Sequence, residues 1–204
     1  MSGFLGLALT CERGDRVVFA DLDFSLARGE ALVLSGANGS GKSSLLRLMA
    51  GLARPVAGRI VWDGTDIAQD PAAHAGRLHY LGHLDAVKPA LTVAENLRFW
   101  ADLRGGGTVE PALAGFGIDH LADTPARFLS AGQRRRLALA RTLAAPAGLW
   151  LLDEPTVALD ADGVTAVHRA IAAHRAAGGC CVVSTNVSLS IEAPRRLDLG
   201  DFAP

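Results

Sequence analysis

The sequence predicts an α/β fold in which helices cover both faces of a mostly parallel β-sheet. Three observations support this prediction: short apolar runs alternate with helical patterns, a glycine-rich loop separates one apolar run from a helix, and another apolar run ends in two acids. Short, continuously apolar strands are typical of a parallel sheet that is buried on both faces. Functional groups are therefore expected at the carboxyl ends of these strands.

The order of the elements follows from the apolar runs. Strands are predicted at residues 31–34, 59–62, 78–81, 149–152 and 180–184, and helices at 44–50 and 164–177. The loosely alternating segment before residue 30 predicts an antiparallel β-subdomain at the N-terminus. A helical, arginine-rich pattern fills residues 87–145. We expect one domain over residues 1–204, with a core of residues 1–86 and 146–204 and an inserted helical lobe of residues 87–145.

Composition excludes several classes of protein. Half of the residues are apolar, which supports a sizeable core, and the formal net charge of −1 argues against a strongly basic nucleic-acid-binding protein. Cys11, Cys180 and Cys181 form no C-x-x-C pair, so we expect them to be buried small side chains in a reducing cytoplasm. We see neither a transmembrane span nor a signal peptide, so a membrane is expected to be reached only through a partner.

A phosphate-binding loop is predicted between the first buried strand and the helix after it. The pattern is G-x-x-x-x-G-K-S, formed by Gly36, Ala37, Asn38, Gly39, Ser40, Gly41, Lys42 and Ser43, with Ser44 following in the helix. Glycines allow successive N–H groups to turn around a phosphate, and the helix N-terminus attracts the same anion. Lys42 is predicted to contact the β- and γ-phosphates, and the Ser43 hydroxyl to hold Mg²⁺. The alternative is a glycine-rich turn that binds nothing.

A second part of the site is predicted where the strand at residues 149–152 ends in Asp153 and Glu154. A doubly buried strand that ends in two carboxylates favours a ligand at that end. Asp153 is expected to orient Mg²⁺, and Glu154 to polarise a water for attack on the γ-phosphorus. The alternative is a polar loop that simply follows a core strand.

The helix predicted after residue 130 permits two interpretations. Ser130 and Gln133 form an S-x-x-Q capping box, which many helices have at their start. The alternative is that this exposed helix N-terminus, which includes Ala131 and Gly132, is an anion site that meets a phosphate held by another subunit.

The order of these motifs, followed by Ala158-Leu159-Asp160, resembles the ATP-binding-cassette (ABC) ATPases over nearly the whole chain. The resemblance implies ATP and Mg²⁺ as ligands, ATP hydrolysis and a head-to-tail homodimer. It implies that ATP lies between Lys42, Ser43, Asp153 and Glu154 of one protomer and the signature segment of the other. The signature segment is Ser130, Ala131, Gly132 and Gln133, and Asp160 belongs to the D-loop.

Within the family, the chain is similar to the ATPase subunits of haem exporters in cytochrome c maturation. Residues 11–13, 45–48, 80–83 and 91–99 carry this likeness, together with Ala131 in the signature. It implies an integral membrane permease (CcmB-like) and further cytochrome c maturation proteins as partners, and no nucleic acid. It also implies a peripheral position on the cytoplasmic face of the inner membrane. The transported species is not encoded in this chain.

Three positions depart from the family pattern. Arg13 occupies the place of the aromatic residue that stacks on adenine, and it either stacks through its guanidinium or is a plain surface arginine. Leu84 replaces a glutamine that usually links Mg²⁺ to the membrane partner. Asn186 replaces the histidine that contacts the γ-phosphate, and since asparagine carries no charge we expect slow hydrolysis.

Two further groups of residues have functional and plain interpretations. His79 and His83 either ligate a metal or haem, or have packing and loop roles. Arg134, Arg135 and Arg136 are predicted to be a solvated first helical turn that contacts acids or a partner protomer. For the whole chain, the alternatives to a haem-related ATPase are an ABC ATPase for another substrate, a slow nucleotide-dependent dimerisation module, and a soluble ABC ATPase acting on nucleic acid.

Overall fold

The computed structural model describes residues 3–14, 16–186 and 189–203, and it contains two β-sheets and six α-helices within these ranges. The strands are β1 Phe4–Arg13, β2 Arg16–Leu26, β3 Ala31–Ser35, β4 Ala57–Trp62, β5 Thr65–Asp66, β6 Leu78–Leu81, β7 Leu149–Asp153, β8 Cys180–Ser184 and β9 Arg195–Asp198. The α-helices are α1 Lys42–Met49, α2 Pro71–Arg77, α3 Val93–Asp102, α4 Glu110–Gly115, α5 Ala131–Ala144 and α6 Ala161–Ala176. Short 3₁₀ helices cover Asp119–Leu121, Ala126–Phe128 and Leu199–Phe202.

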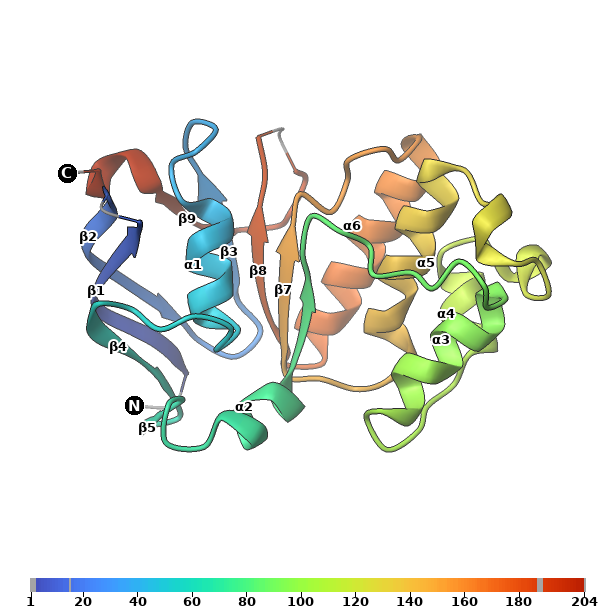
Figure 1. Cartoon of the computed structure of the whole chain (residues 1–204), viewed down its shortest axis with the longest axis horizontal. Coiled ribbons are helices and arrows are strands. Elements are labelled where there is room, and N and C mark those ends of the chain that lie inside the picture. Colours follow the sequence, from blue (N-terminus) through green and yellow to red (C-terminus); the bar gives the residue numbers. More distant parts are fainter. Residues whose placement is uncertain (1–2, 15, 187–188, 204) are drawn as a thin grey trace.

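The two sheets match the predicted fold class. Strands β6-β7-β8-β3-β9 form a sheet in which every pairing is parallel, and β2-β1-β4-β5 form an antiparallel sheet. Helix α1 lies between the two sheets, and α5 and α6 lie on the opposite face of the parallel sheet (Figure 1). Strands β7 and β8 are buried at every residue, as their continuously apolar sequences predict.

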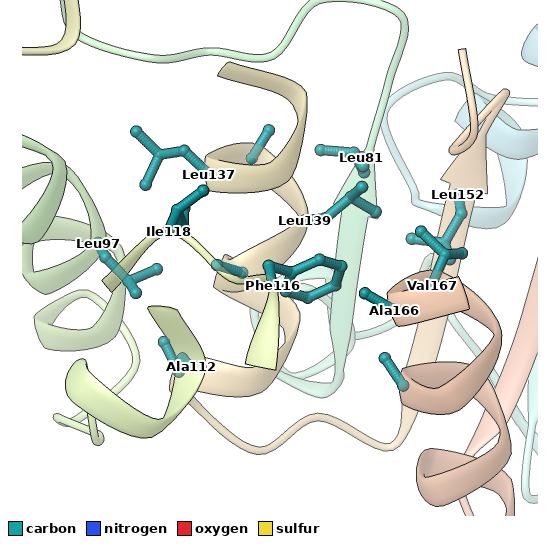
Figure 2. Packing of buried hydrophobic residues seen from close by; sticks show 14 of the residues in the cluster. Leu81, Leu97, Ala112, Phe116, Ile118, Leu137, Leu139, Leu152, Ala166 and Val167 are labelled. Carbon is teal, nitrogen blue, oxygen red and sulfur yellow. The ribbon is translucent and has the colours of Figure 1, made fainter. Parts of the chain in front are cut away.

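The core is divided by the parallel sheet into two apolar clusters. One fills the space around α1 between the two sheets, and it includes Phe4, Phe19 and Leu45, which are fully buried. The other lies between the parallel sheet and helices α3 to α6. Figure 2 shows Phe116 of this second cluster directed toward Leu139 of α5 and Ala166 of α6. The burial of these large side chains stabilises the helices against the sheet.

Register places three strand ends side by side. Leu34 of β3 is paired with Ser184 of β8, and Ser184 is also the neighbour of Asp153 at the end of β7. All three strands run in the same direction, so their carboxyl ends share one edge of the sheet. The loop between β3 and α1 leaves from this edge.

Helix α2, strands β5 and β9 and the 3₁₀ helix Leu199–Phe202 are not predicted by the sequence pattern. Strand β9 has the sequence Arg-Arg-Leu-Asp and adds to β3 at the sheet edge, where its side chains remain largely exposed. The three cysteines are buried and unpaired, as expected, and burial raises the pKa of the Cys180 and Cys181 thiols. Among the described residues, no helix is long and apolar enough to cross a bilayer.

Candidate nucleotide-binding and hydrolysis site

A cavity of about 230 Å³ lies at the shared edge of β3, β7 and β8. The predicted site residues that line it are Arg13, Asn38, Gly39, Gly41, Lys42, Ser43, Ser44, Asp153, Glu154 and Asn186. The fold therefore brings together the glycine-rich loop, the two acids after β7 and the asparagine after β8. Val18 and His83 line the same cavity and were not among the residues predicted to bind a nucleotide.

The loop between β3 and α1 has the backbone that phosphate binding requires. Gly41 has φ of +104°, and a Cβ atom there would lie 2.6 Å from Val18 Cγ1, so both conformation and space exclude a side chain. Helix α1 starts at Lys42 without a side-chain cap, which leaves its first N–H groups available to an anion. The residues present therefore fit a phosphate group.

Lys42 is held inside this loop. Its side chain is buried, and Nζ donates to the carbonyl oxygens of Gly36 at 2.7 Å and Ala37 at 3.1 Å. Gly36, Ala37 and Ser40 belong to the same loop but do not line the cavity, and the Ser40 N–H donates to the Ala37 carbonyl at 3.1 Å. The ammonium is thus positioned by neutral acceptors, and phosphate oxygens are stronger acceptors for the same charge.

Asp153 and Glu154 have different environments although they are adjacent. Asp153 is buried, and its Oδ1 accepts a hydrogen bond from the hydroxyl of Ser184 on the neighbouring strand. The Glu154 N–H donates to the Ser184 carbonyl, and its φ of +48° turns the chain out of the strand. The Glu154 side chain is thereby directed to the cavity rather than into the sheet.

Asn186 links the two halves of the cavity. Its Nδ2 donates to Oε1 of Glu154 at 2.8 Å and to Oδ1 of Asn38, in the glycine-rich loop, at 2.9 Å. The family resemblance implies that this residue contacts the γ-phosphate, and the structure brings it into direct contact with Glu154, the acid predicted to polarise water.

The oxygen atoms in the cavity suit Mg²⁺. The Ser43 hydroxyl and the Asp153 carboxylate line the same space, and both are hard oxygen ligands of the kind that Mg²⁺ prefers beside phosphates. Within the described residues, no group of three or more His, Cys, Asp or Glu side chains forms a separate metal site.

Arg13 and Leu84 occupy different positions relative to the cavity. Arg13 lines it from the end of β1, so both interpretations of this side chain, base stacking and surface arginine, remain predictions. Leu84 is 81% exposed and does not line the cavity, whereas His83 beside it does. The residue of this loop that lines the cavity is therefore His83 and not Leu84.

The signature segment lies in a second cavity, of about 420 Å³, which Ser130, Gly132, Gln133 and Asp160 line. Ser130 and Gln133 form the predicted capping box: the Ser130 hydroxyl accepts from the Gln133 N–H at 3.2 Å, and Gln133 Oε1 accepts from the Ser130 N–H at 2.9 Å. Ser130 and Ala131 are exposed. Within one chain, the signature segment and the glycine-rich loop line different cavities.

Asp160 has a structural role in this second cavity. Its carboxylate caps α6 by accepting from the Gly163 N–H at 2.9 Å, and it forms an ion pair with Arg136. The hydrogen bond from Gly163 and the Arg136 guanidinium hold the pKa of this carboxyl below its usual range. The D-loop is thereby attached to the signature helix.

The arginine run is only partly as predicted. Arg135 and Arg136 do contact acids, Asp85 and Asp160, but Arg135 is 4% exposed and is not a solvated residue. The sequence alone does not show which of three successive arginines is buried, because the burial of each side chain depends on which face of α5 meets the sheet. Ser184 and Arg135 are residues of the site's surroundings that the sequence pattern does not identify.

The two histidines have separate environments. His79 is buried in β6, its Nε2 lies 2.9 Å from the Ala145 carbonyl, and burial lowers its pKa to about 4. His83 is exposed and lines the nucleotide cavity. The packing interpretation therefore holds for His79, and the two rings do not form the proposed metal site.

A glycine-rich loop at a helix N-terminus, with acids at the end of an adjacent parallel strand, defines the class of P-loop nucleoside triphosphatases. The family profile described as "ABC transporter" matches residues 19–157. The chain belongs to the ABC transporter family, as an ATPase subunit.

Similar proteins extend over the full chain. A protein from Paramagnetospirillum magneticum is 55% identical over 99% of this chain and 96% of its own length, and one from Rhodospirillum rubrum is 56% identical over 98% and 87%. Both are named "Cytochrome c biogenesis ATP-binding export protein CcmA".

Solved structures give the same family. An ABC transporter ATP-binding protein from Pyrococcus furiosus superposes with a TM-score of 0.87, 25% identity and full coverage of both chains. A bacterial Atm1-family ABC exporter with ATP bound has a TM-score of 0.85 and 26% identity, over 98% of this chain and 37% of the exporter.

Proposed function

We propose that this chain is the ATP-hydrolysing subunit of a membrane ABC complex that serves cytochrome c biogenesis, where it drives haem export or release of a haem-loaded chaperone. The observation that carries the proposal is the identity of 55–56%, over 98–99% of the chain, to relatives named for cytochrome c biogenesis. The cavity at the ends of β3, β7 and β8 supplies the chemistry that such a subunit needs.

Each side of the cavity has a proposed role. The loop of residues 36–43, with Ser44 and Arg13, binds ATP, and Lys42 turns from the Gly36 and Ala37 carbonyls to the β- and γ-phosphates. Glu154 accepts a proton from the attacking water, and Asn186 holds its carboxylate in place. Ser43 and Asp153 hold Mg²⁺, which neutralises phosphate charge when bound.

The second half of the site is proposed to come from another copy of the chain. The signature segment has exposed Ser130 and Ala131 at the N-terminus of a fourteen-residue helix, and it lines a cavity separate from the glycine-rich loop. In a head-to-tail homodimer each signature segment faces the γ-phosphate held by the other protomer. ATP then joins the protomers, and its hydrolysis separates them.

The membrane partner is proposed to be an integral permease of the CcmB kind, with further cytochrome c maturation proteins in the complex. This arrangement places the chain on the cytoplasmic face of the inner membrane, as a peripheral subunit. The helical lobe of residues 87–145, with the exposed Leu84 beside it, is the proposed contact region. Nucleic acid is not a proposed partner.

Two experiments test the proposal. Phosphate release is measured on the chain assembled with its membrane partner, and Glu154→Gln is expected to reduce turnover by about 10²–10⁴-fold, the range typical of a general base. Covalent haem attachment to c-type cytochromes is measured in cells that lack their own ATPase subunit. Restoration by the wild-type chain but not by Lys42→Ala is expected, and restoration by both chains contradicts the proposal.

A slow nucleotide-dependent dimerisation module is the second candidate. It is favoured by Asn186 and Leu84, which replace the usual histidine and glutamine. In that case the wild-type chain and Glu154→Gln release phosphate at equal, very low rates, while ATP still causes dimerisation.

A further inference from the structure

Arg135 is buried near the start of α5, and its guanidinium contacts two other segments of the chain, residues 153–155 and residues 82–85. Nη2 donates to the carbonyl oxygens of Asp153 and Glu154, both at 2.7 Å, and Nε donates to that of Pro155 at 3.3 Å. Nη1 donates to Asp85 Oδ1 at 2.9 Å and to the Gly82 carbonyl at 3.3 Å. A guanidinium has five N–H donors, and these contacts use all of them.

The three carbonyls belong to successive residues at the point where β7 leaves the sheet. Glu154 is the first residue after β7 and lies in the left-handed region, with φ of +48°, so the chain turns out of the strand at this residue. Ser184 holds its N–H from one side, and Arg135 holds its carbonyl from the other. The backbone of Glu154 is therefore fixed between a strand of the sheet and the signature helix.

The same side chain also fixes the loop after β6. The carboxylate of Asp85, which is partly exposed, is its ion-pair partner, and the Gly82 carbonyl lies next to His83, which lines the nucleotide cavity. One buried cation thus joins the start of the signature helix, the backbone of the acid pair and the loop after β6.

Lysine does not reproduce this arrangement. An ammonium has three donors on one atom, whereas the acceptors here lie around a planar fork. Replacement of Arg135 by lysine leaves some of the successive carbonyls without a donor, and the turn at Glu154 becomes free to shift.

We propose that Arg135 is a positioning residue for hydrolysis: its guanidinium fixes the backbone of residues 153–155, so that the Glu154 carboxylate is held at the water position. Because this inference rests on the role given to Glu154 under the proposed function, its test is a double-mutant comparison. A residue that acts through Glu154 has no effect on turnover once Glu154 is replaced.

The experiment measures single-turnover release of labelled phosphate and the Kd of a non-hydrolysable ATP analogue, on the chain assembled with its membrane partner. All variants are assayed at one temperature, well below the thermal midpoint of the least stable variant, so that unfolding does not contribute to the differences in rate. We expect Arg135→Lys to lower the hydrolysis rate at least about tenfold, with the Kd changed less than about threefold. In the Glu154→Gln background we expect it to change the rate less than about twofold.

Two further variants support the comparison. Arg134→Lys is the matched control, because the Arg134 guanidinium donates to the Leu129 carbonyl at 2.9 Å rather than to residues 153–155, and its rate is expected to stay within about twofold of wild type. Asp85→Asn keeps Arg135 and its carbonyl contacts but weakens one of the five. If Arg135→Lys does not fold, Asp85→Asn is expected to show the same pattern with a smaller loss, about threefold.

The possible failures are distinguishable. Equal losses from Arg135→Lys in both backgrounds, or an unchanged rate in the wild-type background, overturn the positioning role and leave the proposed function intact. Equal losses from Asp85→Asn in both backgrounds do the same. If Glu154→Gln alone leaves hydrolysis unchanged, the role of Glu154 fails and the role of Arg135 fails with it.

Discussion

The side chain of Asn186 connects the glycine-rich loop to the acid pair, because one Nδ2 group donates to both Asn38 and Glu154. A hydrogen bond between neutral groups contributes about 0.5–1.5 kcal/mol and one that involves a charged group about 1.5–3 kcal/mol, but the amide of Asn186 brings no charge of its own. Asn186 can therefore hold Glu154, but it stabilises a developing negative charge on phosphate less than a protonated imidazole does.

We expect Asn186→His to raise turnover by up to about tenfold, since about 1.4 kcal/mol of transition-state stabilisation corresponds to that factor. Steady-state phosphate release with the assembled complex measures the effect. Asn186→Ala is the control, and it should lower turnover because Oε1 of Glu154 loses its donor. Unaltered or lower turnover in Asn186→His would count against this account.

Individual residues of the site differ in how far sequence predicts them. The glycine-rich loop, Asp153 and Glu154 are predictable because their chemistry depends on local spacing. Arg135 is not, since the burial of one arginine among three depends on which face of α5 packs against the parallel sheet at β6. Ser184 can be identified as the hydrogen-bond partner of Asp153 only when the register of β7 and β8 is known.

At the scale of elements, α3 and α5 start in the same way but face different surroundings. Both have complete capping boxes, Thr92 with Glu95 in α3 and Ser130 with Gln133 in α5. The contributions of these caps to stability should be similar, and they provide a matched pair that separates capping from ligand binding.

Thr92→Ala and Ser130→Ala should each lower the free energy of unfolding by about 1 kcal/mol, the usual effect of removing such a cap. Only Ser130→Ala is expected to reduce phosphate release at saturating ATP. Urea unfolding and the phosphate assay, run on the same preparations, measure both quantities. Equal activity losses would mean that Ser130 acts only as a helix cap.

The elements that sequence predicts least well are the short and charged ones. Strand β9 is exposed at the sheet edge and has no apolar alternation, so its pairing with β3 is set by tertiary contacts. Helix α2 has a readable start, with Asp70 as N-cap and Pro71 in the first turn, but its seven residues show no apolar stripe. The buried strands are predictable because burial on both faces leaves a continuous apolar run.

At the scale of the whole molecule, the two halves of the proposed site lie in separate cavities of one chain. Strand β6, at one edge of the parallel sheet, contacts helix α5, which carries the signature segment. His79 of β6 contacts the Ala145 carbonyl just after α5. Burial, partly offset by this hydrogen bond, lowers the pKa of His79 from 6.5 to about 4. The folded state therefore favours the neutral form of the His79 ring.

Stability should depend on this histidine at acidic pH. Because its folded pKa is depressed, the contribution is complete above about pH 6.5 and is lost as the pH falls toward 4, by at most about 3 kcal/mol. His79→Gln cannot titrate, so its unfolding free energy should decline less steeply over this interval than that of the wild type. Chemical denaturation at a series of pH values measures the difference, and parallel curves would contradict the depressed pKa.

The central claim is that ATP holds two copies of the chain together, between the Lys42 loop of one and the Ser130 helix end of the other. Its most direct test is sedimentation of Glu154→Gln with Mg²⁺ and ATP, which should convert a 21.2 kDa species into one of twice that mass. ADP, or Ser130→Glu in the same background, should leave the monomer. The claim would be contradicted if the protein stayed a monomer at saturating ATP in samples where nucleotide binding is verified. It would also be contradicted if the Ser130→Glu variant formed the dimer as readily as the protein without this substitution.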